Sequence, residues 1–298
     1  MEVALTRGLI RFARSLPREA GFRIFSTIGA AAGLVLRRDR QRAVDNLEIA
    51  FPGMTLTVRQ AMTRAMFKTL GRNAFEFLNL KGSTRERLAT LVERVEGREH
   101  LEKALNTDGG VIAVTGHIGC WELMGGYFAT QGFEVNVVGR ELWEPRLNRE
   151  LVRIRESVGL RTIDRDGGGK QILRILRAGG IVAILIDQHT RVSGVYVPFF
   201  SRPAHTPVAV AKLALKTGAT ILPIAIYMTE RGKHVIRILP AIEDPPRGEN
   251  ADRKAEIITE HCSRAVEDLI RYDPKQWVWF HRRWRDPEGA DVSHALAG

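Results

Sequence analysis

The chain has 298 residues, 44% of them hydrophobic, which excludes wholesale disorder and is enough for one large domain or two small ones. The net charge of +11 and the pI of about 10.2 favour an anionic partner, such as a membrane surface, an acidic carrier protein or nucleic acid, although a basic enzyme without such a partner stays possible. Only two cysteines occur, Cys120 and Cys262, and their distance in the sequence argues against a disulfide scaffold or a zinc–cysteine site.

Residues 1–80 are predicted to form a helical, membrane-docking region. From Met1 to Arg42 nine arginines accompany three acidic residues, and apolar residues lie between them. A helix that lies in a membrane interface needs this mixture, because its apolar face enters the lipid while its cations meet headgroups. A solvated basic face packed on a domain is the alternative. A further helix is expected after Pro52, with Thr55 or Thr57 as its N-cap.

The apolar segment at residues 24–36 is too short to span a bilayer, which takes roughly 20 apolar residues. It fits a core helix, an interfacial helix or a cleavable signal. Four arginines interrupt the approach to it and no convincing cleavage site follows, so the signal is the weakest of these interpretations. Whether this segment inserts into a membrane or only lies on it stays open.

From about residue 108 short β-rich runs alternate with amphipathic helical patterns. Strands are expected at 111–115, 135–138, 181–186, 221–227 and 235–239, and helices at 145–158, 170–177, 207–217 and 253–271. Near-continuous apolar strands that alternate with helices indicate an α/β fold, a central mostly parallel sheet flanked by helices on both faces. No linker divides residues 81–298, so we expect them to form one domain.

The stretch GHIGCWE places His117 directly after a predicted strand and Glu122 in the first turn of the next helix. Five positions on one regular helix would put the two side chains about 140° apart, on different faces. With His117 in the loop, the Glu122 carboxylate can reach back, fix the imidazole tautomer and stabilise the imidazolium. This is a general base with its orienting group, without an evident nucleophile. A hydrogen-bonded structural histidine is the alternative.

Other catalytic motifs fit poorly. The spacing of His117 and Glu122 is not that of a zinc HExxH site, and no G-x-S-x-G elbow is present. DGGGKQ at 166–171 lacks the first glycine and the Ser/Thr of a phosphate-binding P-loop, and is interpreted as a glycine-rich helix entry. Nucleic-acid binding rests on charge alone, because no RNP, zinc-finger or helix-turn-helix pattern accompanies it. No metal site is expected.

Seven blocks in order resemble the late acyltransferases of lipid A biosynthesis, the lauroyl/myristoyl transferase group, and their phosphatidylinositol mannoside relatives. The blocks are NLEIAFPGMT, GHIGCWE (the H-x4-D/E box of glycerolipid acyltransferases), RLNRELVRIRESVG, LIDQHT, GVYVPFFSRPAHTP, ILPIAIY and PKQWVWFHRRW. The resemblance runs from about residue 8 to 286. One H-x4-E is a weak signal, whereas these blocks in the same order are a strong one.

The resemblance implies a membrane-associated O-acyltransferase that moves a fatty acyl chain from an acyl-carrier-protein or acyl-CoA thioester to a hydroxyl of a lipid A precursor. His117 would be the general base, oriented by Glu122, and the acceptor hydroxyl would be the nucleophile. Backbone amides at the start of the next helix would stabilise the intermediate. No cofactor beyond the donor is implied. The expected location is the cytoplasmic face of the cell inner membrane, without a spanning helix.

The same blocks supply candidate substrate-binding residues. Arg155 matches the arginine that precedes a glycine by four, and is expected to bind a headgroup phosphate or support the site. Asp187 matches the acidic residue of the next block, and is expected to position Arg155 or sugar hydroxyls. Gln188 and Arg191 in the same loop, and Arg140 after the second strand, are weaker candidates.

Two positions depart from the pattern: His189 replaces a frequent acidic residue and Ser201 a usual glycine, which puts the acceptor more in doubt than the chemistry. Phe199, Phe200 and Thr206 belong to another block, in which the phenylalanines could line an acyl channel or pack in the core. Another glycolipid acyltransferase, such as a phosphatidylinositol mannoside acyltransferase, is the alternative function. A lipid-binding protein without turnover is the non-enzymatic one, and the intact His–Glu pair argues against it.

Overall fold

A computed structural model describes residues 2–285 of the chain. The helices are α1 (Glu2–Ser15), α2 (Arg18–Val35), α3 (Arg37–Ala50), α4 (Leu56–Leu80), α5 (Arg85–Leu91), α6 (Arg98–Leu105), α7 (Trp121–Thr130), α8 (Pro145–Glu156), α9 (Gly169–Arg177), α10 (Ala209–Thr217), α11 (Ala251–Tyr272) and the 3-10 turn η1 (Pro274–Gln276). The strands are β1 (Val92–Glu96), β2 (Val111–Thr115), β3 (Val135–Gly139), β4 (Arg161–Asp164), β5 (Ile181–Leu185), β6 (Gly194–Phe199), β7 (Arg202–Pro207), β8 (Thr220–Met228) and β9 (His234–Ile238).

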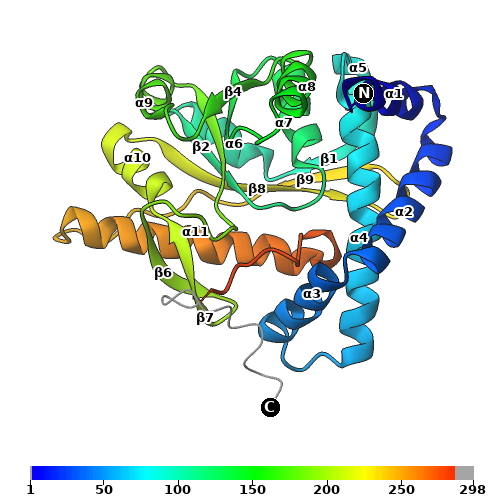
Figure 1. The fold of residues 1–298 in the computed structure, drawn as a ribbon. Helices are drawn as coiled ribbons and strands as arrows, with labels where there is room; N and C mark the ends of the chain where they lie inside the picture. The colour runs from blue at the N-terminus through cyan, green and yellow to red at the C-terminus, as the bar shows by residue number, and fades with distance from the viewer. Residues whose placement is uncertain (1, 286–298) are drawn as a thin grey trace.

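Seven strands form one sheet in the order β1-β9-β8-β2-β5-β3-β4 (Figure 1). The five strands from β8 to β4 run parallel, whereas β9 pairs antiparallel with β8 and carries β1 alongside it. The predicted mostly parallel sheet is therefore confirmed. Its order puts β2 and β5, which are about 70 residues apart in the sequence, side by side in the middle.

Helices cover both faces of the sheet, as the apolar strands indicated. Successive residues of a strand point to opposite faces, so Val111 belongs to a core formed with α5 to α8 and Ile112 to a core formed with α9 to α11. The two helical layers lie on opposite sides of the central strands in Figure 1. Both residues are fully buried, which explains why β2 is apolar at each position.

All five predicted strands and all four predicted helices of this region are present, with ends shifted by at most two residues. The sequence did not predict β1, β4 or the β6–β7 hairpin. β1 and β4 lie at the two edges of the sheet, where half-exposed charged residues hide the strand pattern. The hairpin turns at Phe200 and Ser201 with φ of 51° and 61°, a left-handed backbone that glycine adopts more readily than serine.

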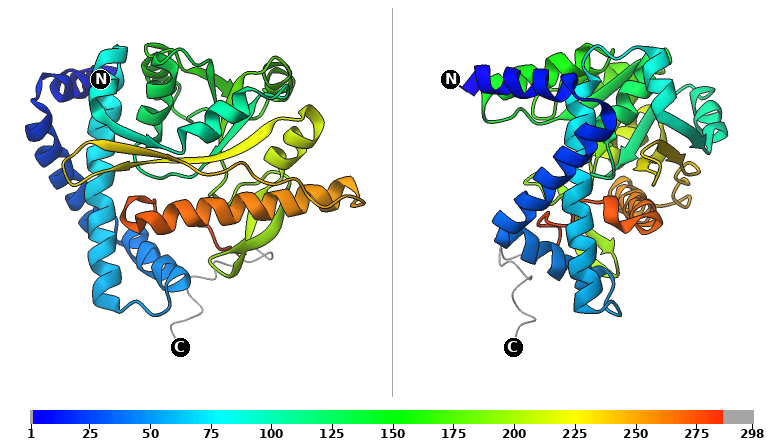
Figure 2. Two further views of the ribbon diagram at one scale, coloured as in Figure 1. Left: turned by 180° about the vertical axis from the view of Figure 1, so that it is seen from behind. Right: turned by 90° about the vertical axis from the view of Figure 1, so that its right-hand side faces the viewer.

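The N-terminal helices form a separate layer against α4, which Figure 2 shows from behind and from the side. α2 and α4 meet at Gly29 and Gly71: a Cβ on Gly71 would lie 1.9 Å from the carbonyl oxygen of Phe25, so only glycine allows this approach. Thr55 caps α4, accepting a hydrogen bond from the amide of Val58 at 3.4 Å, one of the two predicted caps. Leu47 of α3, Phe67 of α4 and the sheet residue Ile112 belong to one core cluster, which joins this layer to the rest.

In residues 2–285 no single helix has the length and apolar character to cross a bilayer. The pair α2 and α3 satisfies those criteria only when the two helices are taken as one segment, and the chain bends by 91° between them.

Candidate active site

The centre of the site forms where β2 and β5 end. In the parallel register Thr115 pairs with Leu185, so the residues two positions beyond each strand, His117 and Asp187, meet at the same edge of the sheet. Parallel sheets commonly place reactive groups at this carboxyl edge. Gly116 permits the approach, because a Cβ there would lie 2.9 Å from the Asp187 carboxylate.

The Asp187 carboxylate is buried and accepts three hydrogen bonds. The donors are the His117 backbone amide at 2.6 Å, the His117 ring nitrogen Nδ1 at 2.8 Å and the Trp277 indole at 2.7 Å. Burial by itself would raise the pKa of Asp187, but the imidazole and these donors hold that pKa below its ordinary value. The carboxylate is therefore ionised at neutral pH.

This contact determines the tautomer of His117. An ionised carboxylate only accepts hydrogen bonds, so Nδ1 carries the proton and Nε2 presents its lone pair. The amide nitrogen of Gln188 lies 3.2 Å from that Nε2 and 2.9 Å from Nε2 of His281. The side chain of His117 is 21% exposed, so a hydroxyl can reach Nε2 once the Gln188 amide moves aside.

His281 is the second imidazole of the site, with its ring centroid 4.8 Å from that of His117. Burial, together with the neighbouring His117, lowers the pKa of His281 to about 4, although Asp187 acts in the opposite direction. His281 is therefore neutral at pH 7 and adds no positive charge beside His117.

The predicted pairing of Glu122 with His117 is wrong. Glu122 forms a two-point ion pair with Arg155, Nε to Oε2 at 2.9 Å and Nη2 to Oε1 at 2.6 Å, and both side chains are largely buried. Asp187 takes the orienting position instead. The prediction that Asp187 positions Arg155 is also wrong, because Arg155 is paired with Glu122. The physical reason is the strand order: His117 leaves β2 beside β5, whereas Glu122, in the first turn of α7, faces α8.

The loop between His117 and α7 is fixed by the C-terminal segment. Ile118 pairs with Trp277 in a β-bridge, and the amide of Gly119 donates to the carbonyl of Gln276 at 2.9 Å. Gly119 has φ of 57° and no room for a Cβ, which would lie 2.0 Å from the carbonyl oxygen of Ile226. The segment that carries Trp277, about 160 residues further along the chain, thus fixes the position of the loop that follows His117.

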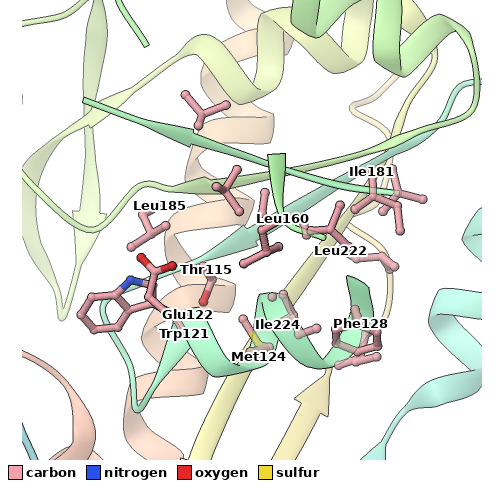
Figure 3. A pocket seen from close by; sticks show the side chains of 18 of the residues that line it. Thr115, Trp121, Glu122, Met124, Phe128, Leu160, Ile181, Leu185, Leu222 and Ile224 are labelled. Atoms are coloured by element: carbon pink, nitrogen blue, oxygen red, sulfur yellow. The ribbon is translucent and has the colours of Figure 1, made fainter. Parts of the chain in front are cut away.

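A narrow cavity of about 70 Å³ lies between α7 and the sheet. Its lining comes from β2, β3, β5 and β8 and is almost entirely apolar, with the Glu122–Arg155 pair as its charged wall. Figure 3 shows Thr115, Trp121, Glu122 and Leu185 at one end, beside the carboxyl edge of the sheet, with Phe128 and Ile181 at the other. The cavity therefore begins at the edge that carries His117 and runs back under the sheet.

The remaining predicted residues are dispersed. Arg140 and Arg191 are exposed, in the loops that follow β3 and β5. Phe199 and Phe200 are buried in the aromatic core against Trp277, Trp279 and Trp284 and do not line this cavity, so the core alternative holds for them. Thr206 is also buried, and its hydroxyl accepts a hydrogen bond from Arg283.

Sequence reasoning missed Trp277 and His281. Both lie in the block PKQWVWFHRRW, whose signal in the sequence is its resemblance to the family. Their spacing from His117 carries no signal, since nothing in a linear pattern brings residues 160 positions apart to one carboxylate. In residues 2–285 no cluster of three or more His, Cys, Asp or Glu side chains is arranged to hold a metal ion.

Comparison with known proteins identifies the family of the chain. The model of the bacterial lipid A biosynthesis acyltransferase family matches residues 3–286. The lipid A biosynthesis lauroyltransferase of Escherichia coli is 26% identical over 95% of this chain and 91% of its own length. The phosphatidylinositol mannoside acyltransferase of Mycobacterium tuberculosis is 27% identical over 74% of this chain and 69% of its own.

Among solved structures, the 1-acyl-sn-glycerophosphate acyltransferase PlsC of Thermotoga maritima has 15% sequence identity and a TM-score of 0.38, over 83% of this chain and 97% of that one. The family match extends over nearly every described residue, from α1 to the segment that carries Trp277 and His281. The chain belongs to the bacterial lipid A biosynthesis acyltransferase family and is an acyltransferase.

Proposed function

We propose that this acyltransferase moves a fatty acyl chain from an acyl-carrier-protein or acyl-CoA thioester to a hydroxyl of a lipid A precursor, at the cytoplasmic face of the inner membrane. The observation that carries the proposal is the His117–Asp187 pair at the strand edge, beside an apolar cavity. The similarity to the lauroyltransferase over 95% of the chain supports this class of acceptor.

In the proposed reaction His117 is the general base. Nε2 takes the proton of the acceptor hydroxyl as its oxygen attacks the thioester carbonyl, and Asp187 stabilises the resulting imidazolium through Nδ1–H. Collapse of the tetrahedral intermediate breaks the carbon–sulfur bond, and the thiolate takes the proton from Nε2. The products are an ester and a free thiol, so the thioester donor supplies all that the transfer needs.

The oxyanion of the intermediate needs hydrogen-bond donors. α7 begins at Trp121, four residues after His117, and its first N–H groups have no partner within a helix. In the proposal these amides bind the oxyanion, and the positive end of the helix adds to their effect.

The apolar cavity is the proposed site of the acyl chain. Its lining of aliphatic and aromatic side chains suits a hydrocarbon. Trp121 lines one end of it, and the ring centroid of Trp121 lies 4.9 Å from that of His117. The Glu122–Arg155 pair closes its wall near that end. In this arrangement Arg155 supports the chain-binding site through Glu122, and Arg140, Gln188 and Arg191 remain candidates for headgroup contacts.

The function can be tested with purified protein, a lipid A precursor and acyl-carrier-protein or CoA donors, with the product detected by mass spectrometry. A mass gain of one acyl chain is expected, and it is expected to disappear in His117→Ala while circular dichroism shows the same fold. An unchanged transfer rate in His117→Ala would contradict the mechanism. No transfer to any lipid A precursor by the unchanged protein would contradict the acceptor.

A phosphatidylinositol mannoside or similar glycolipid is the second candidate acceptor. The 27% identity to the mycobacterial phosphatidylinositol mannoside acyltransferase favours it, over a shorter part of the chain. Offering both acceptors in one assay distinguishes the two, because only one of them would gain the mass of an acyl chain. Lipids that co-purify unchanged would instead favour a lipid-binding protein.

A further inference from the structure

A second cavity, of about 410 Å³, opens on the layer formed by α2, α3 and α4, which we call the outer helical layer. This layer lies away from the strand edge. The cavity lies between α2, α3 and α4, the three helices that Figure 2 shows side by side. Side chains from all three helices line it. Gly33 gives it depth, because a Cβ there would lie 2.9 Å from the ring of Phe67.

The charge of this cavity is entirely positive. Arg40, Arg64 and Lys68 line it, and no acidic residue does. Two carboxylates adjoin lining residues in the sequence: Asp39 is paired with Arg42 at 2.9 Å, and Asp45 accepts a hydrogen bond from Gln41 at 2.8 Å. Within residues 2–285 none of the three lining cations forms an ion pair. Three unpaired cations around one hollow suit an anion of more than one charged or polar oxygen.

Thr63 supplies an independent observation. Its side chain is 1% exposed, it lines the cavity, and its hydroxyl has no hydrogen-bond partner among the described residues. A buried hydroxyl without a partner costs free energy, so such groups are rare unless a ligand or water completes them. Gln60 adds a further donor on the rim, whereas the Gln41 amide donates to Asp45 at 2.8 Å.

An exposed apolar stripe runs beside the cavity along α2. Ile24, Ile28 and Val35 are 36%, 52% and 78% exposed, and at 100° per residue they lie within about 40° of one another on one face of the helix. Leu34, 64% exposed, belongs both to this surface and to the cavity lining. Leu36 at the corner between α2 and α3 extends the stripe, and hydrocarbon is the surrounding that such a stripe fits beside cations.

We infer that the cavity between α2, α3 and α4 binds the phosphate headgroup of an anionic glycerophospholipid of the bilayer. The phosphate meets Arg40, Arg64 and Lys68 and accepts a hydrogen bond from Thr63, while the acyl chains lie along the Ile24–Ile28–Val35 stripe. This lipid is a docking ligand and is not consumed. The inference rests on the membrane association included in the proposed function, to which it adds a defined site and headgroup chemistry.

The site would also orient the enzyme. Phe67 lines the cavity and stacks on Phe280 at 5.7 Å, and the next residue, His281, touches the catalytic imidazole. One aromatic pair therefore separates the headgroup cavity from the reaction centre. A lipid bound there would hold the strand edge close to the bilayer surface, where a lipid acceptor is found.

The inference is tested with the full chain and vesicles of phosphatidylcholine, with and without phosphatidylglycerol, measured by co-sedimentation. Soluble dihexanoyl phosphatidylglycerol and inorganic phosphate are titrated separately by calorimetry. In Arg64→Gln/Lys68→Gln we expect affinity for the phosphatidylglycerol vesicles and the soluble lipid to fall about 25-fold, from roughly 1 kcal/mol per cation. Thr63→Val is expected to lower it about 5-fold, the effect of one hydrogen bond.

The matched control is Arg174→Gln/Arg177→Gln on α9, which removes the same charge far from the cavity and is expected to change vesicle binding less than 3-fold, as for a diffuse surface effect. Circular dichroism checks the fold of each variant. If the double variant does not fold, Lys68→Gln alone, at an exposed position, replaces it.

An equal loss of vesicle affinity in both double variants, with no effect of Thr63→Val, would show that binding depends only on general surface charge. That result would overturn the inference. Inorganic phosphate binding as tightly as the soluble lipid would also overturn it. If Arg64→Gln/Lys68→Gln raises the KM for the acceptor in detergent micelles, the cavity binds the substrate and the inference is overturned. If the unchanged protein binds no vesicle, membrane association itself fails, whereas loss of transfer in His117→Ala with vesicle binding intact leaves the inference standing.

Discussion

The strand edge and the outer helical layer differ in whether their polar side chains have hydrogen-bond or ion-pair partners within the protein. At the strand edge the Asp187 carboxylate is surrounded by three donors from the protein, and Glu122 and Arg155 satisfy each other. In the cavity between α2, α3 and α4, the described residues leave Arg64, Lys68 and the Thr63 hydroxyl without partners.

The difference teaches what each region is prepared for. A base must hold its tautomer before the substrate arrives, so its partners have to be part of the fold. A binding surface for an anion gains affinity from cations that the protein has not already neutralised. Under the two proposals, internally hydrogen-bonded polar groups mark the catalytic position, and unpaired charges mark the docking position.

The largest effect is expected from Asp187→Asn. With an amide at this position the Nδ1 proton is no longer fixed, so kcat is expected to fall on the order of 10³- to 10⁴-fold, as for other buried carboxylates that orient a base. The ¹⁵N signal of the His117 ring measures the tautomer directly. It is expected to shift in Asp187→Asn and to stay in place in Glu122→Gln. The reverse pattern would return the orienting role to Glu122.

His281 is expected to make the strand edge sensitive to acid. Its pKa is about 4 in the folded protein against 6.5 in the unfolded chain, so below pH 6.5 the unfolded chain takes a proton that the folded one does not. Stability is full above pH 6.5 and falls towards pH 4, by about 3 kcal/mol from this residue.

Urea unfolding at pH 7 and at pH 4 measures this effect, and His281→Gln is expected to reduce the difference between the two values. An identical pH dependence in the variant would show that His281 is not held neutral. The outer layer has no comparable buried imidazole in the cavity between α2, α3 and α4, so the comparison predicts that acid weakens the strand edge first.

Gly71→Ala tests the outer layer by packing instead of charge. The added methyl would meet the backbone of α2 at Phe25, and the helices have to separate, at a cost of about 1–3 kcal/mol in unfolding free energy. Gly53→Ala is the matched control, because nothing lies within 4 Å of its Cβ position. The urea midpoint measures both, and equal midpoints would show that α2 and α4 do not need this close approach.

The sequence by itself determined the α/β sheet, because apolar runs and amphipathic periods are local properties. The five predicted strands, the four predicted helices and the cap at Thr55 follow from residues within a few positions of each other. It also identified His117 as the residue that leaves a buried strand. The edge strands and the β6–β7 hairpin were not predicted, because charged residues and Pro198 obscure the alternation of apolar residues that indicates a strand.

Only the tertiary structure decided which carboxylate serves His117. Glu122 is nearer in the chain, but the parallel pairing of β2 with β5 brings Asp187 to the imidazole, and α8 brings Arg155 to Glu122. Trp277 and His281 arrive from the C-terminal segment in the same way. Hydrogen bonds act over about 3 Å in space, whatever the distance along the chain. The local pattern therefore identified His117, whereas the order of the strands in the sheet determined that Asp187 is its partner.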